Sequence, residues 1–242
     1  MKYSTILEEP SYPPSGGRGA STLAIKIMNQ TYTIITQQLP VMEHFYTLQG
    51  EGFHQGRAAY FIRLGGCDVG CVWCDVKESW DAGAHPKFFV DEIVSFVADN
   101  AAPNIAGNRG GLVVITGGEP LMHDLTQLTK ELKQKGYETN IETSGAHPLS
   151  GTWDWICLSP KKFKAPLPEV IPFANELKVV IFNQSDFKWA EEYAALVSPQ
   201  CKLFLQPEWD KAGIVTPMII EYIKQHPQWE LSLQIHKYIN VP

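Results

Sequence analysis

Three cysteines, Cys67, Cys71 and Cys74, lie close together in the segment Gly-Gly-Cys-Asp-Val-Gly-Cys-Val-Trp-Cys-Asp. Thiolates are ligands for soft metals, and the glycines allow the backbone to fold closely around a metal centre. A cubane of iron and sulfide normally takes four cysteines, so three would leave one iron open to another ligand. An open iron indicates chemistry rather than electron storage or a structural role.

Two other readings of the cysteines remain open at this point. Zinc also accepts three cysteines and a histidine, and His54 and His85 are the nearest histidines, but the paired C-x-x-C spacing of structural zinc sites is absent. A disulfide framework fits poorly because five cysteines cannot all pair and no secretory leader is recognised. Cys157 and Cys201 lie in or beside apolar runs, so we expect both to be buried thiols.

Composition favours a globular protein without a membrane or nucleic-acid partner. The chain has 242 residues, which suits one large α/β domain, and 44% of them are hydrophobic. No apolar run approaches the roughly 20 residues of a membrane span. The formal net charge is −6 and no block of lysine or arginine stands out, which argues against binding a phosphate backbone. Cysteines expected to be reduced point to the cytoplasm.

The first 28 residues differ from the rest, because proline and glycine crowd them without a periodic pattern. We therefore expect a disordered extension over residues 1–28 and a single core domain over residues 29–242. Met28 is a candidate for the biological start. A mitochondrial presequence is the alternative, although Glu8 and Glu9 reduce the basic character that such peptides need.

After residue 40, runs typical of strands alternate with runs typical of helices, and these elements would position the cysteines. Strands are expected at Ala58–Leu64, Leu112–Thr116, Glu138–Glu142, Trp155–Leu158, Glu176–Phe182, Lys202–Leu205 and Glu230–Ile235. Helical faces are formed by Phe89, Ile93, Phe96 and Val97 and by Leu125, Leu128 and Leu132, while Ser185-Asp186 and Thr216-Pro217 are expected to begin two further helices. This alternation predicts a parallel sheet, either open or closed into a full or partial barrel.

Unusual polar residues follow five of the expected strands. The segments are Thr116-Gly-Gly-Glu-Pro120, Glu142-Thr-Ser-Gly145, Ser159-Pro-Lys161, Gln206-Pro-Glu-Trp209 and Gln234-Ile-His-Lys237. In a parallel β/α fold the carboxyl ends of the strands meet on one functional rim. The cysteine loop also follows a strand, so we predict that all these groups form one active site.

The cysteine spacing together with Gly117-Gly-Glu-Pro120 resembles the radical S-adenosylmethionine superfamily. The resemblance implies a modified, compact, partial (β/α)6 barrel of the TIM type. It implies that Cys67, Cys71 and Cys74 hold a [4Fe–4S] cluster whose open iron binds S-adenosylmethionine. It also implies that the cofactor is bound by Trp73, Cys74, Asp75, Gly118, Ser159, Pro160, Lys161, Gln206, Pro207, Glu208 and Trp209.

A second set of motifs is similar to the 7-carboxy-7-deazaguanine synthase family: Glu43-x-Phe-x-Thr-Leu-Gln-Gly-Glu-Gly52, Phe61-Ile-Arg-Leu64 and the ending Gln234-Ile-His-Lys-Tyr-Ile-Asn-Val-Pro242. Members of this family convert 6-carboxy-5,6,7,8-tetrahydropterin to 7-carboxy-7-deazaguanine with release of ammonia, in 7-deazapurine biosynthesis such as that of queuosine. The resemblance places Leu48, Gln49, Gly50, Glu51, Arg63, Thr116, His236 and Pro242 at the substrate. Arg63 suits the substrate carboxylate because its planar guanidinium matches that group.

One position departs from the family pattern. The family usually has threonine two residues after the last cysteine, where it helps to bind magnesium, whereas here Asp75 is followed by Val76 and Lys77. Valine cannot bind a hard cation. Either other groups bind magnesium, or Lys77 replaces its charge, or no metal ion is needed.

The resemblance also implies partners. A flavodoxin-like or ferredoxin-like protein would supply electrons, and a homodimer is common in the family. The nearest alternative function is a radical activase that acts on a partner protein. A zinc-stabilised binding module is the alternative from a different class.

Overall fold

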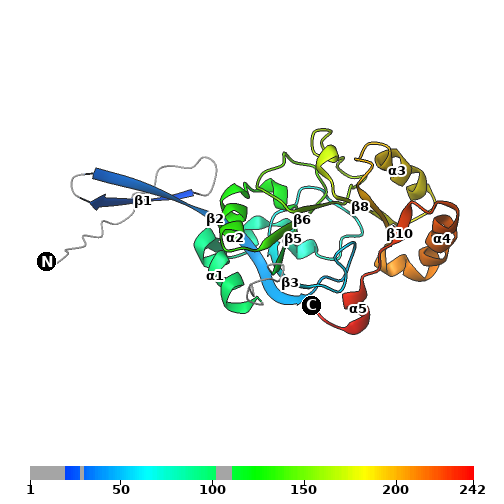
Figure 1. Ribbon diagram of the computed structural model, residues 1–242, viewed down its shortest axis with the longest axis horizontal. Helices are drawn as coiled ribbons and strands as arrows, with labels where there is room; N and C mark the ends of the chain where they lie inside the picture. The colour runs from blue at the N-terminus through cyan, green and yellow to red at the C-terminus, as the bar shows by residue number, and fades with distance from the viewer. Residues whose placement is uncertain (1–19, 28–29, 102–110) are drawn as a thin grey trace.

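The computed structural model describes residues 20–27, 30–101 and 111–242, which form one mixed sheet with helices against it (Figure 1). Within these residues the sheet has ten strands in the order β1-β2-β3-β5-β6-β7-β8-β9-β10, and β4 pairs with β2. The strands are β1 (Ala20–Ile27), β2 (Gln30–Leu48), β3 (Ala58–Leu64), β4 (Lys87–Phe89), β5 (Leu112–Gly117), β6 (Glu138–Thr143), β7 (Trp155–Leu158), β8 (Glu176–Ile181), β9 (Lys202–Pro207) and β10 (Trp229–Leu231).

Helices follow most of the central strands. They are α1 (Val90–Asn100), α2 (Thr126–Gln134), α3 (Ser185–Ala194), α4 (Ala212–Gln225) and α5 (Ile235–Ile239), with 3₁₀ turns η1 (Lys77–Trp80), η2 (Ala82–Ala84), η3 (Pro120–Met122), η4 (Ile171–Phe173) and η5 (Trp209–Lys211). Neighbouring strands run parallel from β3 to β10, and the connections β6–β7 and β7–β8 contain no α-helix among the described residues. The fold is therefore a compact partial barrel that does not close, as the sequence predicted.

Side chains alternate between two apolar layers on strand β3. Tyr60, Ile62 and Leu64 join a core cluster with α1 and α2, whereas Ala59 and Phe61 face the barrel interior with residues of β5. A second outer cluster packs α3 and α4 against β8 and β9. Because both faces of these strands are covered, most of their residues are apolar, as expected from the sequence.

Three expectations about secondary structure were wrong. The sheet is not wholly parallel, since β2 pairs antiparallel with β1, β3 and β4. Residues 235 onwards form α5 instead of extending the last strand, which ends at Leu231. Helix α4 begins at Ala212 and contains Pro217, because the Glu208 carboxylate caps Asp210 N and Lys211 N and begins the helical turns earlier.

Within the expected disordered extension over residues 1–28, residues 1–19 and 28 lie outside the described part of the chain. Residues Ala20–Ile27 instead form β1, whose backbone pairs along its length with β2 and so satisfies its hydrogen bonds on that side. Met28 as the start and the single domain over residues 29–242 stay predictions.

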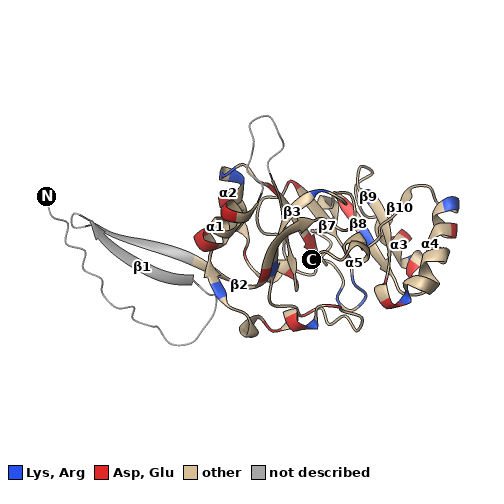
Figure 2. Ribbon diagram, turned by 90° about the horizontal axis from the view of Figure 1, so that it is seen from below, with Lys and Arg blue, Asp and Glu red and all other residues tan. Residues whose placement is uncertain are grey.

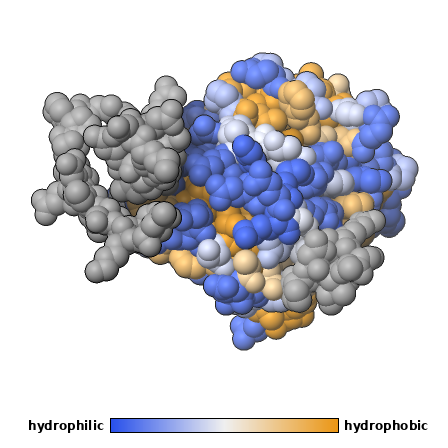
Figure 3. All heavy atoms as spheres, turned by 60° about the vertical axis from the view of Figure 1, so that its left-hand side comes forward, coloured by the Kyte–Doolittle hydropathy of each residue, from blue (hydrophilic) through white to orange (hydrophobic). Residues whose placement is uncertain are grey.

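No helix in the described part of the chain is long and apolar enough to cross a bilayer. Acidic and basic residues are interspersed along the ribbon, and the face seen in Figure 3 is largely hydrophilic with separate hydrophobic areas (Figures 2 and 3). This pattern agrees with the absence of a lysine and arginine block in the sequence.

Candidate active site

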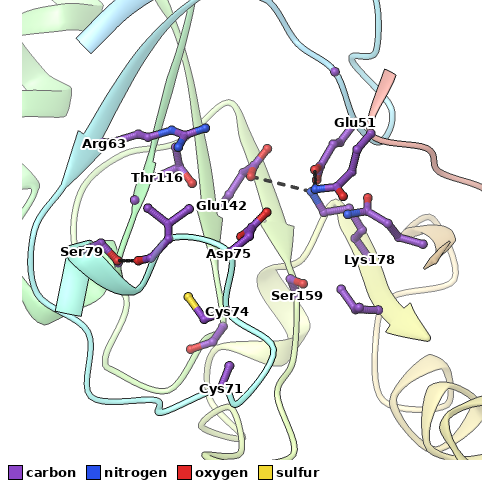
Figure 4. A pocket seen from close by; sticks show the side chains of 18 of the residues that line it. Glu51, Arg63, Cys71, Cys74, Asp75, Ser79, Thr116, Glu142, Ser159 and Lys178 are labelled. Atoms are coloured by element: carbon purple, nitrogen blue, oxygen red, sulfur yellow. Dashed lines mark hydrogen bonds and ion pairs between the residues drawn. The ribbon is translucent and has the colours of Figure 1, made fainter. Parts of the chain in front are cut away.

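A cavity of about 260 Å³ lies at the carboxyl ends of the parallel strands, and polar side chains from far apart in the sequence line it (Figure 4). Figure 4 shows Cys71 and Cys74 on one side of the cavity, Arg63 and Thr116 on a second side, and Glu51 and Lys178 on a third. Cys67 and Glu142 line the same cavity. This is the rim that the polar strand ends predicted.

Arg63 and Thr116 lie side by side on the neighbouring strands β3 and β5. Arg63 is opposite Thr116 in the register of β3 and β5, and both side chains face the interior because they follow Phe61 and Val114 by two residues. The Arg63 guanidinium lies 3.1 Å from Glu43 and 5.5 Å from the centre of the Phe45 ring. Arg63 therefore both lines the cavity and forms the partly exposed ion pair that is the ordinary role of a surface arginine.

The cysteine loop packs against the barrel. Cys71 is buried with Val69 and Ala146, and Cys67, Trp73 and Cys74 pack around this cluster. Gly66 N donates to Ser79 O over 2.6 Å and Cys67 N donates to Trp80 O over 3.1 Å, which ties the loop to η1. Burial raises the pKa of Cys71 to about 11 in the metal-free chain, so loading a metal centre must displace protons.

Two glycines at the end of β5 allow its backbone to cross over the end of β3. Gly117 has φ of +115°, and a Cβ there would lie 2.4 Å from the backbone of Leu64. A Cβ on Gly118 would lie 2.2 Å from Gly66 O and 3.1 Å from the Cβ of Cys67. The Gly117-Gly118 pair therefore places backbone without side chains directly beside the cysteine loop.

The third residue of that motif, Glu119, holds the rim together. Its buried carboxylate accepts hydrogen bonds from the Thr143 hydroxyl at 2.5 Å, from Ser144 N at 2.8 Å and from Leu121 N at 3.1 Å. These bonds join the ends of β5 and β6. Because a buried carboxylate is costly unless its oxygens are satisfied, the network fixes both strand ends in one arrangement.

Lysine and serine meet in the segment Ser159-Pro-Lys161. Lys161 Nζ donates to the backbone O and side-chain Oγ of Ser159 over 2.6 and 2.5 Å, and lies 5.8 Å from the Trp73 ring centre. Burial lowers the pKa of Lys161. Pro160 does not line the cavity, whereas the residues on both sides of it do.

The end of the chain covers the cavity. Ile235 N donates to Gly50 O over 3.0 Å, and a Cβ on Gly50 would lie 2.1 Å from Nδ1 of His236. His236 and Pro242 both line the cavity. Burial lowers the pKa of His236, so its ring is neutral near pH 7.

Three charged residues of the cavity were not predicted as site residues: Lys178, Glu119 and Glu142. Lys178 donates to the Glu51 carboxylate and lies 3.7 Å from the Glu142 carboxylate. Glu142 had been noted only as part of a polar strand end. A signal existed for Lys178, because Glu176 and Lys178 alternate with apolar residues in a strand that must be buried on both faces.

Apart from Pro160, the structure brings every residue predicted for the substrate, the cofactor and the cluster to this one cavity. Cys157 and Cys201 are buried, and neither lines it. Neither histidine considered as a zinc ligand, His54 or His85, lines it either. Lys77 is exposed and does not line the cavity.

The donor set fits a cluster better than a single ion. In the described residues, no three His, Cys, Asp or Glu side chains are arranged to hold one metal ion. A cluster binds each thiolate to a different iron, so its cysteines need not meet at one point. Three free cysteines around one cavity, with glycine backbone beside them, therefore fit a [4Fe–4S] centre with one open iron.

Comparison with known sequences agrees with this geometry. Residues 48–156 match the family described as a 4Fe-4S single cluster domain. A 7-carboxy-7-deazaguanine synthase of Flavobacterium psychrophilum is 54% identical over 206 residues, which are 85% of this chain and 94% of that protein. The corresponding enzyme of Synechocystis is 50% identical over 86% of this chain and 96% of that protein.

A solved structure shares the fold. The crystal structure of QueE from Escherichia coli superposes with a TM-score of 0.70 at 32% identity, covering 81% of this chain and 93% of that one. A 7-carboxy-7-deazaguanine synthase of Escherichia coli is 35% identical over 223 residues. The similarity thus extends over most of each chain.

Proposed function

Because this chain belongs to the 7-carboxy-7-deazaguanine synthase family, we propose that its cavity converts 6-carboxy-5,6,7,8-tetrahydropterin to 7-carboxy-7-deazaguanine and ammonia. The observation that carries this proposal is one cavity lined by three cysteines and by the polar groups that suit a pterin. Substrate and product differ by one molecule of ammonia, so the overall reaction consumes no oxidant.

The cluster and S-adenosylmethionine supply, when bound, the one-electron chemistry that removes a hydrogen atom from the substrate. Cys67, Cys71 and Cys74 would hold the cluster. We assign the cofactor to the side of the cavity formed by Trp73, Gly118 and Lys161, where backbone and an ammonium can meet its amino and carboxylate groups. In this arrangement the protein orients the reactants and excludes water.

On the substrate side, Glu51 and Gln49 offer acceptors and donors for the pyrimidine edge of a pterin. Arg63 suits the carboxylate on the reduced ring, since its present partner Glu43 is half exposed and water can replace that pairing. His236 and Pro242 complete the same side. A small, lined cavity of this kind favours a small molecule over the partner protein of an activase.

The position that supplies a magnesium ligand in the family has no oxygen atom to offer in this chain. Val76 lines the cavity with an aliphatic side chain, which cannot bind a hard cation. We therefore propose turnover without magnesium. Activity should stay within about twofold after treatment with a chelator that spares the cluster, whereas a loss reversed by magnesium would refute this.

We further propose a homodimer in the cytoplasm that is reduced by a flavodoxin-like or ferredoxin-like donor. Five free cysteines without a disulfide suit a reducing compartment. Sedimentation and turnover with a purified donor test these points separately from the reaction itself.

The deciding experiment is anaerobic reconstitution with iron and sulfide, followed by incubation with S-adenosylmethionine, a reductant and the carboxylated tetrahydropterin. We expect 7-carboxy-7-deazaguanine and ammonia in equal amounts. A reconstituted cluster that cleaves S-adenosylmethionine but leaves the pterin unchanged would refute the substrate. Absence of a cluster would refute the whole assignment.

A further inference from the structure

Lys178 is a buried cation inside the barrel. It lies in the middle of β8 and its side chain is only 5% exposed. Its ammonium donates to Glu51, which comes from the segment after β2, and lies 3.7 Å from Glu142 on β6. Figure 4 shows Lys178, Glu51 and Glu142 on neighbouring parts of the cavity wall. Lysine is rarely buried to this extent unless it is paired.

The side-chain amide of Gln49 also links the carboxylate of Glu142 to the backbone of Glu51. Gln49 Nε2 donates to Glu142 over 2.9 Å, and Gln49 Oε1 accepts from Glu51 N at 3.0 Å. The other oxygen of Glu51 accepts from Gln234 Nε2 at 2.8 Å. Lys178 and Gln49 thus hold both carboxylates in defined positions at the wall of the cavity.

The two neighbouring carboxylates, Glu51 and Glu142, need a cation close by if both are to stay ionised. Two carboxylates in one enclosed site repel each other, so one of them would take up a proton if no positive charge lay between them. Burial alone would lower the pKa of Lys178, but Glu142 and Glu51 outweigh it and keep that pKa well above 10.5. Burial also acts to raise the pKa of Glu51, yet Lys178 and the hydrogen bonds lower it to about 2.

Several other titratable groups face this pair. Around Lys178 and Glu51 they are Glu142 from β6, Cys157 from β7, Glu176 from β8, Lys161 after β7 and His236 from α5, with Arg63 of β3 facing His236. Cys157 and Glu176 both have a raised pKa because of burial, so neither adds a full negative charge as readily as Glu51 does.

We propose that Lys178 is a positioning residue of the reaction, whose ammonium keeps Glu51 and Glu142 ionised and fixed so that both accept N–H groups of the bound substrate. The inference rests on the proposed function, because a pterin is rich in N–H donors along its pyrimidine edge. A protonated carboxyl at either position would place its O–H group, a hydrogen-bond donor, against an N–H group of the substrate and would weaken binding.

The test compares Lys178→Met with Lys178→Arg in the reconstituted enzyme. Binding of the carboxylated tetrahydropterin is measured from pH 6.5 to 9, above the lowered pKa of His236. Lys178→Met should bind about 30-fold or more weakly at pH 6.5 and recover as rising pH ionises the carboxyls. The wild type and Lys178→Arg should show no such recovery over this range.

A second readout needs no substrate. Infrared spectra of Lys178→Met at pH 7 should contain a carboxylic-acid C=O band that the wild type and Lys178→Arg lack. If the wild type binds no pterin, the proposed substrate fails while this spectroscopic result still decides the role of Lys178.

Folding is controlled by the double variant Glu142→Gln/Lys178→Met, which removes one carboxylate with the cation. It should melt closer to the wild type than Lys178→Met does, and its infrared band should disappear. An affinity loss in Lys178→Met that is equal at every pH, or a spectrum without the new band, would overturn the proposal.

Discussion

Asp75, the residue after the third cysteine, accepts a hydrogen bond of 2.9 Å from Lys237 of α5. The same ammonium lies 4.8 Å from the centre of the Trp209 ring, and Trp209 packs edge-on against Tyr238. The Lys237 ammonium therefore connects three segments: the cysteine loop, the segment after β9 and the end of the chain.

Replacing Lys237 with methionine should raise the KM for S-adenosylmethionine or the pterin by up to about tenfold. The ion pair is partly exposed, so it and the ring contact are together worth about 1 kcal/mol. Steady-state kinetics measure the change. Lys224→Met is the matched control, because among the residues that the structure describes Lys224 pairs with Glu221 alone, on the exposed face of α4. Unchanged KM values in Lys237→Met would contradict the coupling.

Cys71→Ala should abolish the cluster, seen as loss of bound iron, loss of brown colour and no reductive cleavage of S-adenosylmethionine. Cys201→Ala is the comparison, since that cysteine is equally buried but lies outside the cavity. It should keep its full iron content at a cost of about 1 kcal/mol in stability. Equal iron loading in both variants would exclude the cysteine loop as the cluster site.

Gly118→Ala should greatly reduce cofactor binding, by about 100-fold or more, because its methyl group would lie 2.2 Å from Gly66 O and force the backbone apart. Gly213→Ala in α4 meets no atom within 4 Å and should leave binding unchanged. Equilibrium binding of S-adenosylmethionine to the reconstituted protein checks both. Normal binding by Gly118→Ala would show that the close crossing of the backbones is unimportant.

Glu51→Gln should destabilise the metal-free protein at pH 7 by on the order of 3 kcal/mol, because the folded chain holds the pKa of Glu51 at about 2 instead of 4.5. The stabilisation is present above pH 4.5 and is lost as the pH falls towards 2. The difference between wild type and variant should therefore shrink between pH 5 and pH 3. Urea unfolding at these pH values measures it, and a difference that does not change with pH would contradict the charge interaction.

The sequence located the central strands well because burial on both faces leaves short apolar runs. Ala58–Leu64 and Trp155–Leu158 were predicted to the residue. It did not reveal β2, whose residues Gln30–Leu48 mix polar and apolar types and pair antiparallel with β3. Pro217 suggested a helix start, but Glu208 already caps η5 and α4 follows that turn directly at Ala212.

The site was predictable where motifs lie in loops and less so within strands. Gly118 and Cys71 belong to segments whose spacing has a chemical meaning. Lys178 belongs to a strand, and only its partners across the barrel, Glu51 and Glu142, reveal its role. Lys77, close to the cysteines in sequence, is exposed at the start of η1 and does not line the cavity.

The docking of the chain's end has a practical consequence for expression. Val241 N donates to His236 O over 3.1 Å, and Pro242 faces the cavity. Pro242 is also exposed, so an affinity tag fused after it would place extra residues directly beside the cavity. Purification handles therefore belong at the opposite terminus.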